Sequence, residues 1–495
     1  MTGRPRVEGS VRPGWEAVRD AFAQGQAHDD GHAQLAVRHH GRVVVDLWTT
    51  GPAASRSAAA RSVAAGAGDA SSAASRPAAA AAGAAAAGAA AAGAAAAGAA
   101  AAGAAGAGPA VTAATGPAAT GLATTGADAR RTGPSDAGGP GTGGPGPRPY
   151  GPDSVGVLMS VSKALVAVCA HLLAERGALD LDAPVARYWP EFAAAGKADT
   201  TVTDLLAHRA GLPAFTADPG GAPLPALLDG GARVRALAEM QPVWQPGSAF
   251  LYHALTYGHL VGEVVRRVSG RSVGRFFADQ VAGPLGLDLW IGLPQREEHR
   301  FVPQSAGPPP TAGRVAAAVQ ELGLAPDHPL ATALRASAAE LARVTRALDR
   351  REGRAAEIPG AGAIGNARSL ARLHAALIGP VDGVRLLSSR TVDRARAPQT
   401  DHLPQPAPLH RFDGPDRSRF GLGFELPRPG EPLLGEGSFG HAGAGGRLGM
   451  AHPESGLAVG YVCTAMSWDP SAGPDPRWVP WTAAVREAAG IPART

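Results

Sequence analysis

The sequence predicts an α/β (α+β) fold in which strands near both ends of the chain flank a mostly helical region. Short apolar segments at residues 35–37 and 43–47 are typical of an early strand pair, and residues 448–452 and 457–465 of a late hairpin. Between the two pairs, from about residue 200 to 370, apolar residues recur mostly with a helical period. The predicted order of elements is therefore α/β/α/β.

Each further element follows from its own apolar pattern. Trp15, Val18 and Phe22 recur at helical spacing and predict a helix before the early strands. Other helices are predicted over residues 333–348 and 367–377, with a last one around 478–489. The chain thus divides into 1–50 with the first helix and strands, 51–147 as an insertion, 148–200 with a serine-bearing helix, 201–370 as a helical domain, and 371–495 with the late strands and last helix.

Residues 51–147 are dominated by alanine and glycine and contain almost no large apolar side chain. Such a segment cannot bury enough apolar surface to offset the entropy of ordering, so we predict a disordered, low-complexity insertion. Transient helix in the alanine runs is the alternative, because alanine has high helix propensity. The uncharged run 78–108 is long enough to cross a bilayer, but it lacks Leu, Ile, Val and Phe. A membrane span is therefore not expected.

Composition excludes several other classes of protein. About 400 residues remain outside the insertion, which is ample for a large hydrophobic core. The net charge of +4 comes from scattered arginines, and only 5% of the residues are aromatic, which argues against nucleic-acid binding. Residues 1–15 lack the apolar segment of a secretory signal, so a cytoplasmic location is expected. The sequence specifies no oligomeric state.

Metal binding has little support in the sequence. His28 and His32 have the spacing of two ligands on a helix, but Gly31 and two aspartates between them indicate a solvated loop. No H-E-x-x-H or C-x-x-C pattern is present, so neither a metal nor another cofactor is expected. The two cysteines, Cys169 and Cys463, are interpreted as buried free thiols, although their separation leaves a disulfide open.

The segment Ser160-Val-Ser-Lys163 stands at the start of a helix that ends at Gly177. Residues three apart share a helix face, so the hydroxyl and the ammonium are predicted to lie side by side. A serine becomes a nucleophile when a base takes its proton, and a lysine is such a base only when its pKa is lowered. The chain has 46 Lys and Arg residues but only two lysines, Lys163 and Lys197, and arginine cannot act as a base. Ser160 and Lys163 are therefore candidate catalytic residues.

Other interpretations of the serines compete with this one. An isolated S-x-x-K most often marks a helix cap followed by a solvated lysine. Residues 270–274 match G-x-S-x-G, the nucleophile elbow of α/β-hydrolases, but that motif must follow a buried strand. Residues 257–268 have a helical period, so Gly270 is predicted to end one helix and Ser272 to cap the next. Ser162 points away from the lysine face and is not expected to be the nucleophile.

Two later motifs accompany S-x-x-K in a fixed order. Tyr252-His-Ala precedes a helix, and His441-Ala-Gly443 leads into the late hairpin. With these motifs the chain resembles the serine β-lactamase and penicillin-binding-protein-like superfamily, and most closely its class C β-lactamase-like carboxylesterase branch, the family VIII esterases and lipases. The resemblance covers residues 10–50 and about 150–490, and further matching segments are 205–213, 284–287 and 420–424.

The resemblance implies an antiparallel sheet built from both chain ends, flanked by helices, with an inserted helical domain and the active site in the cleft between the two parts. It also implies acyl transfer through a covalent ester on Ser160, with Lys163 and Tyr252 moving the proton. A phenol is a base at neutral pH only if a cation favours phenolate, so Lys163 is expected to supply that charge and to titrate together with Tyr252.

The same resemblance also implies which groups bind the oxyanion and line the cleft. The oxyanion would be bound by the backbone N–H groups of Ser160 and Ala444, and Gly443 would let the backbone approach the substrate closely. His441 would line the cleft as a hydrogen-bonding or weakly cationic group.

Two departures from the β-lactamase pattern favour neutral esters as substrates. Ala254 stands where β-lactamases have the asparagine of the tyrosine motif, and His441 replaces their permanent cation, although Arg447 is a candidate for restoring the charge. We therefore predict a serine hydrolase that cleaves small to medium carboxylic esters, with a small-molecule ester as its partner. A β-lactamase, D-Ala-D-Ala-type peptidase or acyltransferase is the alternative, and a noncatalytic binding protein of this fold is the third.

Overall fold

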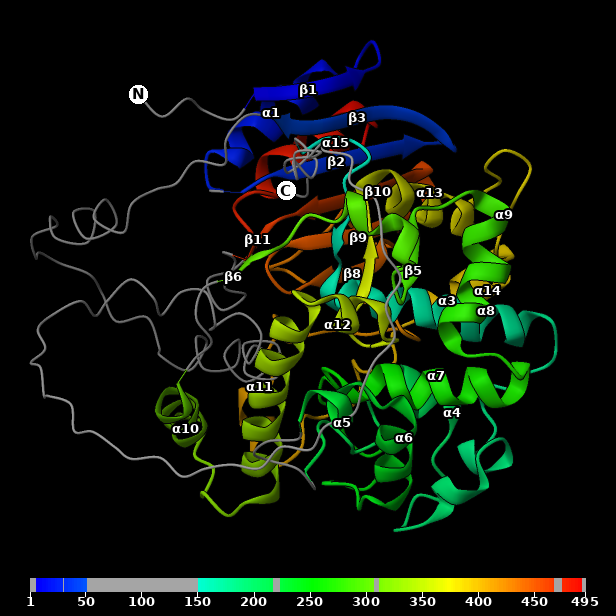
Figure 1. The fold of residues 1–495 in the computed structure, drawn as a ribbon, viewed down its shortest axis with the longest axis vertical. Helices are drawn as coiled ribbons and strands as arrows, with labels where there is room; N and C mark the ends of the chain where they lie inside the picture. Colours follow the sequence, from blue (N-terminus) through cyan, green and yellow to red (C-terminus); the bar gives the residue numbers. More distant parts are fainter. Residues whose placement is uncertain are drawn as a thin grey trace, which may run out of the picture.

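The computed structural model describes residues 6–29, 31–50, 150–216, 223–306, 311–466 and 474–491. Its central element is a six-stranded sheet in the order β1-β3-β2-β10-β9-β8, in which all neighbours are antiparallel (Figure 1). Three strands come from each end of the chain, which confirms the antiparallel sheet expected from the resemblance. The strands are β1 (Arg6–Val11), β2 (Ala33–His39), β3 (Arg42–Thr50), β8 (Phe439–Gly443), β9 (Arg447–His452) and β10 (Leu457–Cys463).

The pairing of β2 with β10 joins the two halves of the sheet. Every residue of β10 is buried. Val459 and Tyr461 pack into the apolar core on one face, and Ala458 and Val462 into the core on the other face. Successive side chains of a strand point to opposite faces, so this distribution shows that both faces of the sheet are covered.

Helices from distant parts of the chain cover the two faces (Figure 1). α1 (Glu16–Gln26) and α15 (Val479–Ala488) pack together on one face, where Phe22 and Trp481 are buried against Tyr461. α13 (Ala367–Ile378) covers the other face and lies so close to β10 that a Cβ at Gly460 would collide with the backbone of α13. The first helix and the helices at 367–377 and 478–489 were predicted close to these bounds.

The region from residue 202 to 355 is mostly helical, as predicted. Short strands also occur there: β5 (Leu289–Ile291) pairs with β7 (Ala363–Gly365), which pairs with β4 (Gly156–Val157), and β6 (Ser305–Ala306) pairs with β11 (Ala465–Met466). No helix within the described parts of the chain is both long and apolar enough to cross a membrane. The helices are α4 (Val202–Leu206), α5 (Leu224–Leu228), α6 (Gly230–Glu239), α7 (Thr256–Ser269), α8 (Val273–Phe277), α9 (Gly283–Leu285), α10 (Ala312–Glu321), α11 (Pro329–Leu348) and α12 (Arg351–Ala355), with α14 (Ser389–Arg396) further along.

The predicted insertion, residues 51–147, and the alternatives of helix or membrane span within it lie outside the described residues. The chain on its two sides meets at one end of the sheet. The ring of Tyr150 stacks on His32 with 4.7 Å between the centroids, and His32 Nδ1 lies 3.5 Å from the hydroxyl of Thr49. Gln34 Nε2 also donates to the carbonyl of Gly151 at 2.7 Å. The segments before and after the insertion are therefore neighbours in space.

Deleting residues 55–145 is expected to leave ester hydrolysis and thermal stability nearly unchanged. The flanking segments already lie together, and no candidate site residue lies within the deleted stretch. The measurement is kcat/KM for a simple ester, together with Tm, for the full chain and the deletion variant. A deletion variant that folds but does not hydrolyse the ester would contradict this expectation.

Candidate active site

Ser160 and Lys163 lie together at the start of α3 (Ser162–Glu175). Ser160 occupies a single turn of 3-10 helix, Met159–Val161, directly before α3, so the α-helix begins slightly later than predicted. Met159 has a φ of 50°, which is uncommon for a residue other than glycine and marks a constrained turn before the serine. Lys163 Nζ lies 3.1 Å from Ser160 Oγ. The three-residue spacing thus brings the two polar groups together as predicted.

Lys163 is completely buried, which changes its proton affinity. Its Nζ donates to the carbonyl of Gly360 at 2.7 Å and lies 4.8 Å from the centroid of the Tyr252 ring. Burial lowers the pKa of Lys163 to about 7, although the carboxyl of Glu425 opposes this change. A substantial fraction of the lysine is therefore neutral at neutral pH and able to accept a proton.

Tyr252 lies before α7 and shares a hydrogen bond with Ser160. Burial raises the pKa of Tyr252 well above its ordinary value, the charge of Glu425 raises it further, and only the hydrogen bond from Ser160 lowers it. The expectation that Lys163 holds this phenol as phenolate is therefore wrong, because desolvation penalises the anion more than any neighbour favours it. The phenol is therefore neutral and able to donate a proton, whereas the neutral form of Lys163 is able to accept one.

His208 and His253 hold the segment that carries Tyr252. The backbone N–H of His253 donates to His208 Nδ1 at 3.1 Å, and the backbone N–H of Leu251 donates to the carbonyl of His208 at 3.2 Å. The imidazole of His208 lies 4.9 Å from the Tyr252 ring between centroids. Burial lowers the pKa of His208 well below its ordinary value, so the ring stays neutral. These contacts identify His208 as a positioning residue for the phenol.

Glu425 is a member of the site that sequence analysis missed. It forms a bridge with Gly440 of β8, and its Oε2 accepts from the backbone N–H of Ala442 at 2.7 Å. Burial raises the pKa of Glu425, and the nearby positive charge of Lys163 acts in the opposite direction. The side-chain charge that raises the pKa of Lys163 is thus that of Glu425 and not that of Tyr252. The only indication of Glu425 in the sequence was its position directly after residues 420–424, one of the segments that resemble the superfamily.

His441 is buried in β8 beside Tyr252, with 6.1 Å between the ring centroids. Its Nδ1 donates to the carbonyl of Ala442 at 2.7 Å, and among the described residues its Nε2 has no hydrogen-bond partner. Burial lowers the pKa of His441 to about 3, and the positive charge of Lys163 lowers it further. The weakly cationic alternative for His441 is therefore wrong. The ring is neutral and offers a free acceptor nitrogen.

Gly443 is the last residue of β8, and Ala444 is the first residue of the turn that follows. A Cβ at Gly443 would collide with the carbonyl oxygen of Leu158, so this glycine lets the end of β8 lie against the chain just before Ser160. Arg447 is completely buried and connects the same two segments. Its Nη1 donates to the carbonyl of Ala444 at 2.7 Å and its Nε to that of Val157 at 3.1 Å. Arg447 therefore fixes the backbone and does not provide an exposed charge for a substrate.

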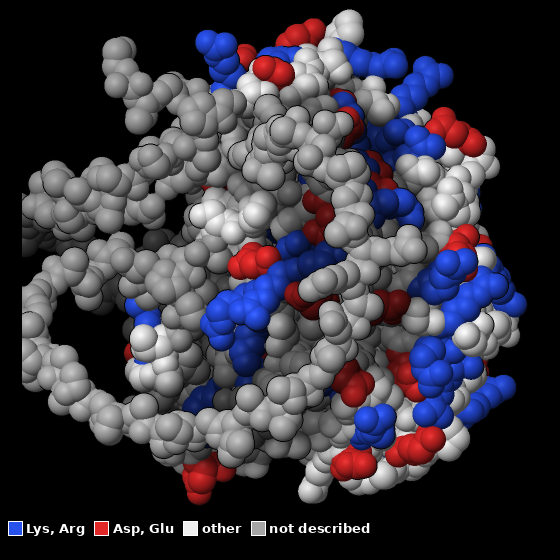
Figure 2. All heavy atoms as spheres, in the orientation of Figure 1, with Lys and Arg blue, Asp and Glu red and all other residues white. Residues whose placement is uncertain are grey.

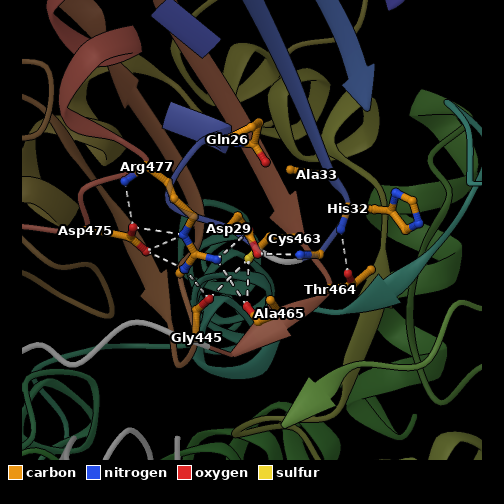
Figure 3. A network of polar contacts seen from close by, with 12 residues as sticks. Gln26, Asp29, His32, Ala33, Gly445, Cys463, Thr464, Ala465, Asp475 and Arg477 are labelled. Atoms are coloured by element: carbon orange, nitrogen blue, oxygen red, sulfur yellow. Dashed lines mark hydrogen bonds and ion pairs between the residues drawn. The ribbon is translucent and has the colours of Figure 1, made fainter. Parts of the chain in front are cut away.

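A second buried arginine holds the next residues of this turn (Figure 3). Arg477 donates to the carbonyl of Gly445 at 2.6 Å, to Asp29 Oδ2 at 2.8 Å and to Asp475 Oδ1 at 2.9 Å. The carboxylates of Asp29 and Asp475 are fully buried, so their ion pairs with Arg477 offset the cost of removing these charges from water. The backbone beside Ala444 is thus anchored to both the early and the late part of the chain.

This network corrects the interpretation of residues 28–32. Residues 28, 29, 31 and 32 lie between α1 and β2 outside regular structure, as expected, but Asp29 is buried in an ion pair and is not solvated. No cluster of three or more possible metal ligands occurs in the parts of the chain that the structure describes. Cys169 and Cys463 are buried free thiols, as interpreted from the sequence.

The two other serines considered above have structural contacts. Ser272 Oγ accepts from the backbone N–H of Arg275 as the cap of α8 and donates to Glu357 at 2.6 Å, and Gly270 adopts the left-handed conformation at the end of α7. Ser162 Oγ donates to the carbonyl of Met159 at 2.5 Å and accepts from the backbone N–H of Ala363 at 2.9 Å. Both serines therefore have the structural positions that were predicted.

The geometry predicts a pH dependence. Lys163 is a base only when neutral, and burial lowers its pKa to about 7, so kcat/KM is expected to rise with pH through about 7 and then to level off. The negative charge of Glu425 raises the pKa of Lys163, so Glu425→Gln should move this rise to lower pH. The measurement is the pH profile of p-nitrophenyl butyrate hydrolysis for both proteins. A midpoint that stays in place in Glu425→Gln would contradict the assignment of the rise to Lys163.

The chain is similar to several known proteins. A family model described as Beta-lactamase matches residues 18–480. The chain is 34% identical over 327 residues to Esterase/beta-lactamase LipL of Mycobacterium tuberculosis, an alignment that covers 63% of this chain and 70% of that protein. The structure of a family VIII carboxylesterase is similar with a TM-score of 0.63 and 27% identity, over 98% of this chain and 100% of the other. EstA from Arthrobacter nitroguajacolicus is similar with a TM-score of 0.65 and 26% identity, over 98% and 99%.

Proposed function

Because the chain belongs to the beta-lactamase family and is a serine hydrolase, we propose that it is a carboxylesterase that cleaves small to medium carboxylic esters through an acyl-Ser160 intermediate. The observation that carries this proposal is the 3.1 Å contact between Ser160 Oγ and the buried Nζ of Lys163. A nucleophile beside a base whose pKa is lowered to about 7 is the arrangement that acyl transfer at neutral pH requires.

In the proposed reaction, Ser160 Oγ attacks the ester carbonyl carbon while its proton passes to Lys163 Nζ. The bond to the alcohol oxygen then breaks, and the leaving alcohol takes this proton, either directly or through the neutral hydroxyl of Tyr252. A water molecule next attacks the acyl carbon and gives its proton to the same pair. Breaking the Ser160 ester restores the hydroxyl and releases the carboxylic acid, so the protons balance over the cycle.

The negative charge on the tetrahedral intermediate requires donors, for which we propose the backbone N–H groups of Ser160 and Ala444. Three contacts support a fixed position for Ala444: the approach of Gly443 to Leu158, the hydrogen bond from Arg447, and the hydrogen bond from Arg477 to Gly445. Donors held in place before the reaction stabilise the developing charge without reorganisation.

The proposed preference for esters rests on the neutral character of the site. His441 is uncharged and Arg447 is buried, so neither offers the permanent cation that would attract the carboxylate of a β-lactam or a peptide. Ala254 provides no side-chain amide for an amide substrate. The similarity to a protein named both esterase and β-lactamase makes β-lactam hydrolysis the second candidate activity.

A fluorophosphonate probe followed by peptide mass spectrometry tests the nucleophile, and an adduct on Ser160 is expected. Turnover of p-nitrophenyl butyrate is then compared with turnover of nitrocefin, and the ester is expected to be the better substrate. Absence of an adduct on Ser160 would remove the serine mechanism. A higher kcat/KM for nitrocefin would instead favour the β-lactamase alternative.

A further inference from the structure

A cavity of about 200 Å³ lies between α5 and the end of α11, outside the set of catalytic residues. Figure 2 shows a group of basic side chains over this end of α11. The cavity is smaller than the roughly 300–1,000 Å³ of sites that enclose a whole drug-sized ligand, so it fits one end of a molecule. Its lining residues are Leu224, Leu227, Arg343, Arg346, Ala347 and Arg350.

The three arginines of this cavity have no acidic partner within the part of the chain that the structure describes. The next two arginines along the chain differ, because Arg351 and Arg354 both pair with Glu298, at 3.3 and 2.7 Å. The Nε of Arg343 is buried without a hydrogen-bond partner among the described residues. A buried unpaired donor is costly, so an acceptor on a ligand would relieve it.

The apolar residues of the cavity belong to a buried cluster that also includes residues beside the active site. Leu227 is buried in an apolar cluster, and Leu224 and Ala444 pack against it. The same cluster contains Met159, which precedes Ser160, and Leu255, which follows the Tyr252 segment. One buried apolar cluster thus borders both the cavity and the segments that carry Ser160 and Tyr252, and the proposal places the acyl chain along this side of the molecule.

We propose that this cavity binds an anionic group at the far end of the substrate's acyl chain, so that the preferred esters are monoesters of dicarboxylic acids. This inference rests on the proposed esterase function. Guanidinium groups bind carboxylates through charge-assisted, often bidentate hydrogen bonds, and the leucines contact the hydrocarbon next to the carboxylate. The reacting ester group itself remains neutral, in keeping with the uncharged surroundings of His441.

The test uses p-nitrophenyl monoesters of unbranched dicarboxylic acids, from succinic to sebacic, and neutral p-nitrophenyl esters of the same chain lengths. At one chain length the anionic ester is expected to have a kcat/KM about tenfold or more above its neutral counterpart, which corresponds to one charge-assisted hydrogen bond. Arg346→Gln/Arg350→Gln should remove this preference and leave the neutral esters unchanged. Both arginines are exposed, so the double variant is expected to fold.

The matched control is Arg314→Gln/Arg390→Gln, which removes two exposed arginines that do not line the cavity and should keep the preference. Arg346→Lys/Arg350→Lys should retain part of the preference, since the charge remains while the planar fork is lost. Hydrolysis of neutral esters without preference for any anionic one would overturn this inference alone. Equal loss of both activities in the glutamine variant would also overturn it, whereas failure to hydrolyse any ester would refute the proposed function.

Discussion

Replacing Ser160 by alanine is expected to lower kcat for p-nitrophenyl butyrate at least about a thousandfold, because the oxygen that forms the covalent intermediate is removed. The substitution deletes one atom from a half-buried side chain, so the fold should persist. The measurement is steady-state hydrolysis together with circular dichroism and Tm. An acyl-chain-length profile of wild type and variant would show that the loss applies to every ester.

Ser272→Ala is the matched control, since Ser272 lies in the competing G-x-S-x-G motif. Its hydroxyl caps α8, so the variant should lose about 0.5–2 kcal/mol of stability and keep most of its activity. If Ser272→Ala were inactive and Ser160→Ala active, the nucleophile would be in the other motif.

Replacing Arg477 by methionine is expected to lower the free energy of unfolding by about 3–5 kcal/mol, because Asp29 and Asp475 would remain buried without a countercharge. The carbonyl of Gly445 would also lose its donor. The turn that carries Ala444 would then be less well fixed, so kcat should fall more than KM rises. Denaturant unfolding and steady-state kinetics at a temperature where the variant is folded measure the two effects.

Arg390→Met provides the comparison, because Arg390 is exposed on α14. Its removal should change the unfolding free energy by about 0.5 kcal/mol or less. An Arg477→Met variant as stable as Arg390→Met would show that the buried network does not stabilise the fold.

Much of the fold was predictable because local patterns decide it. Val18 and Phe22 mark α1, the late hairpin follows from two short apolar segments around a turn, and Gly270 with Ser272 marks a helix end and a helix start. The pairing of β2 with β10 is different, since no local pattern selects a partner strand that far along the chain. The resemblance supplied a sheet built from both chain ends, whereas periodicity alone gave only the strands.

Contacts within the site were predictable where sequence spacing determines them. The pKa values of site residues were not predictable, because they depend on burial in the tertiary structure. Ser160 and Lys163 are neighbours because three residues separate them on one helical turn. The proton affinities of Tyr252 and His441 depend on how deeply each group is buried, which no motif encodes. The sequence gives no signal for the contacts of Glu425 and His208, because their partners, Lys163 and His253, reach them only through the tertiary fold.

The pairing of β2 with β10 has a consequence for when the protein becomes active during folding. Beside this strand pair, Gln26 Nε2 donates to the hydroxyl of Tyr461, although 435 positions separate the two residues. Closing so long a loop costs entropy before the contact forms, which slows the step that completes the sheet. Ser160 and Lys163 can meet within one helix, but the β8–β9 turn is held by Arg477, whose partner Asp29 comes from the early part of the chain. We therefore expect catalytic competence to arise late in folding, and the recovery of esterase activity during refolding to lag behind the recovery of helical structure.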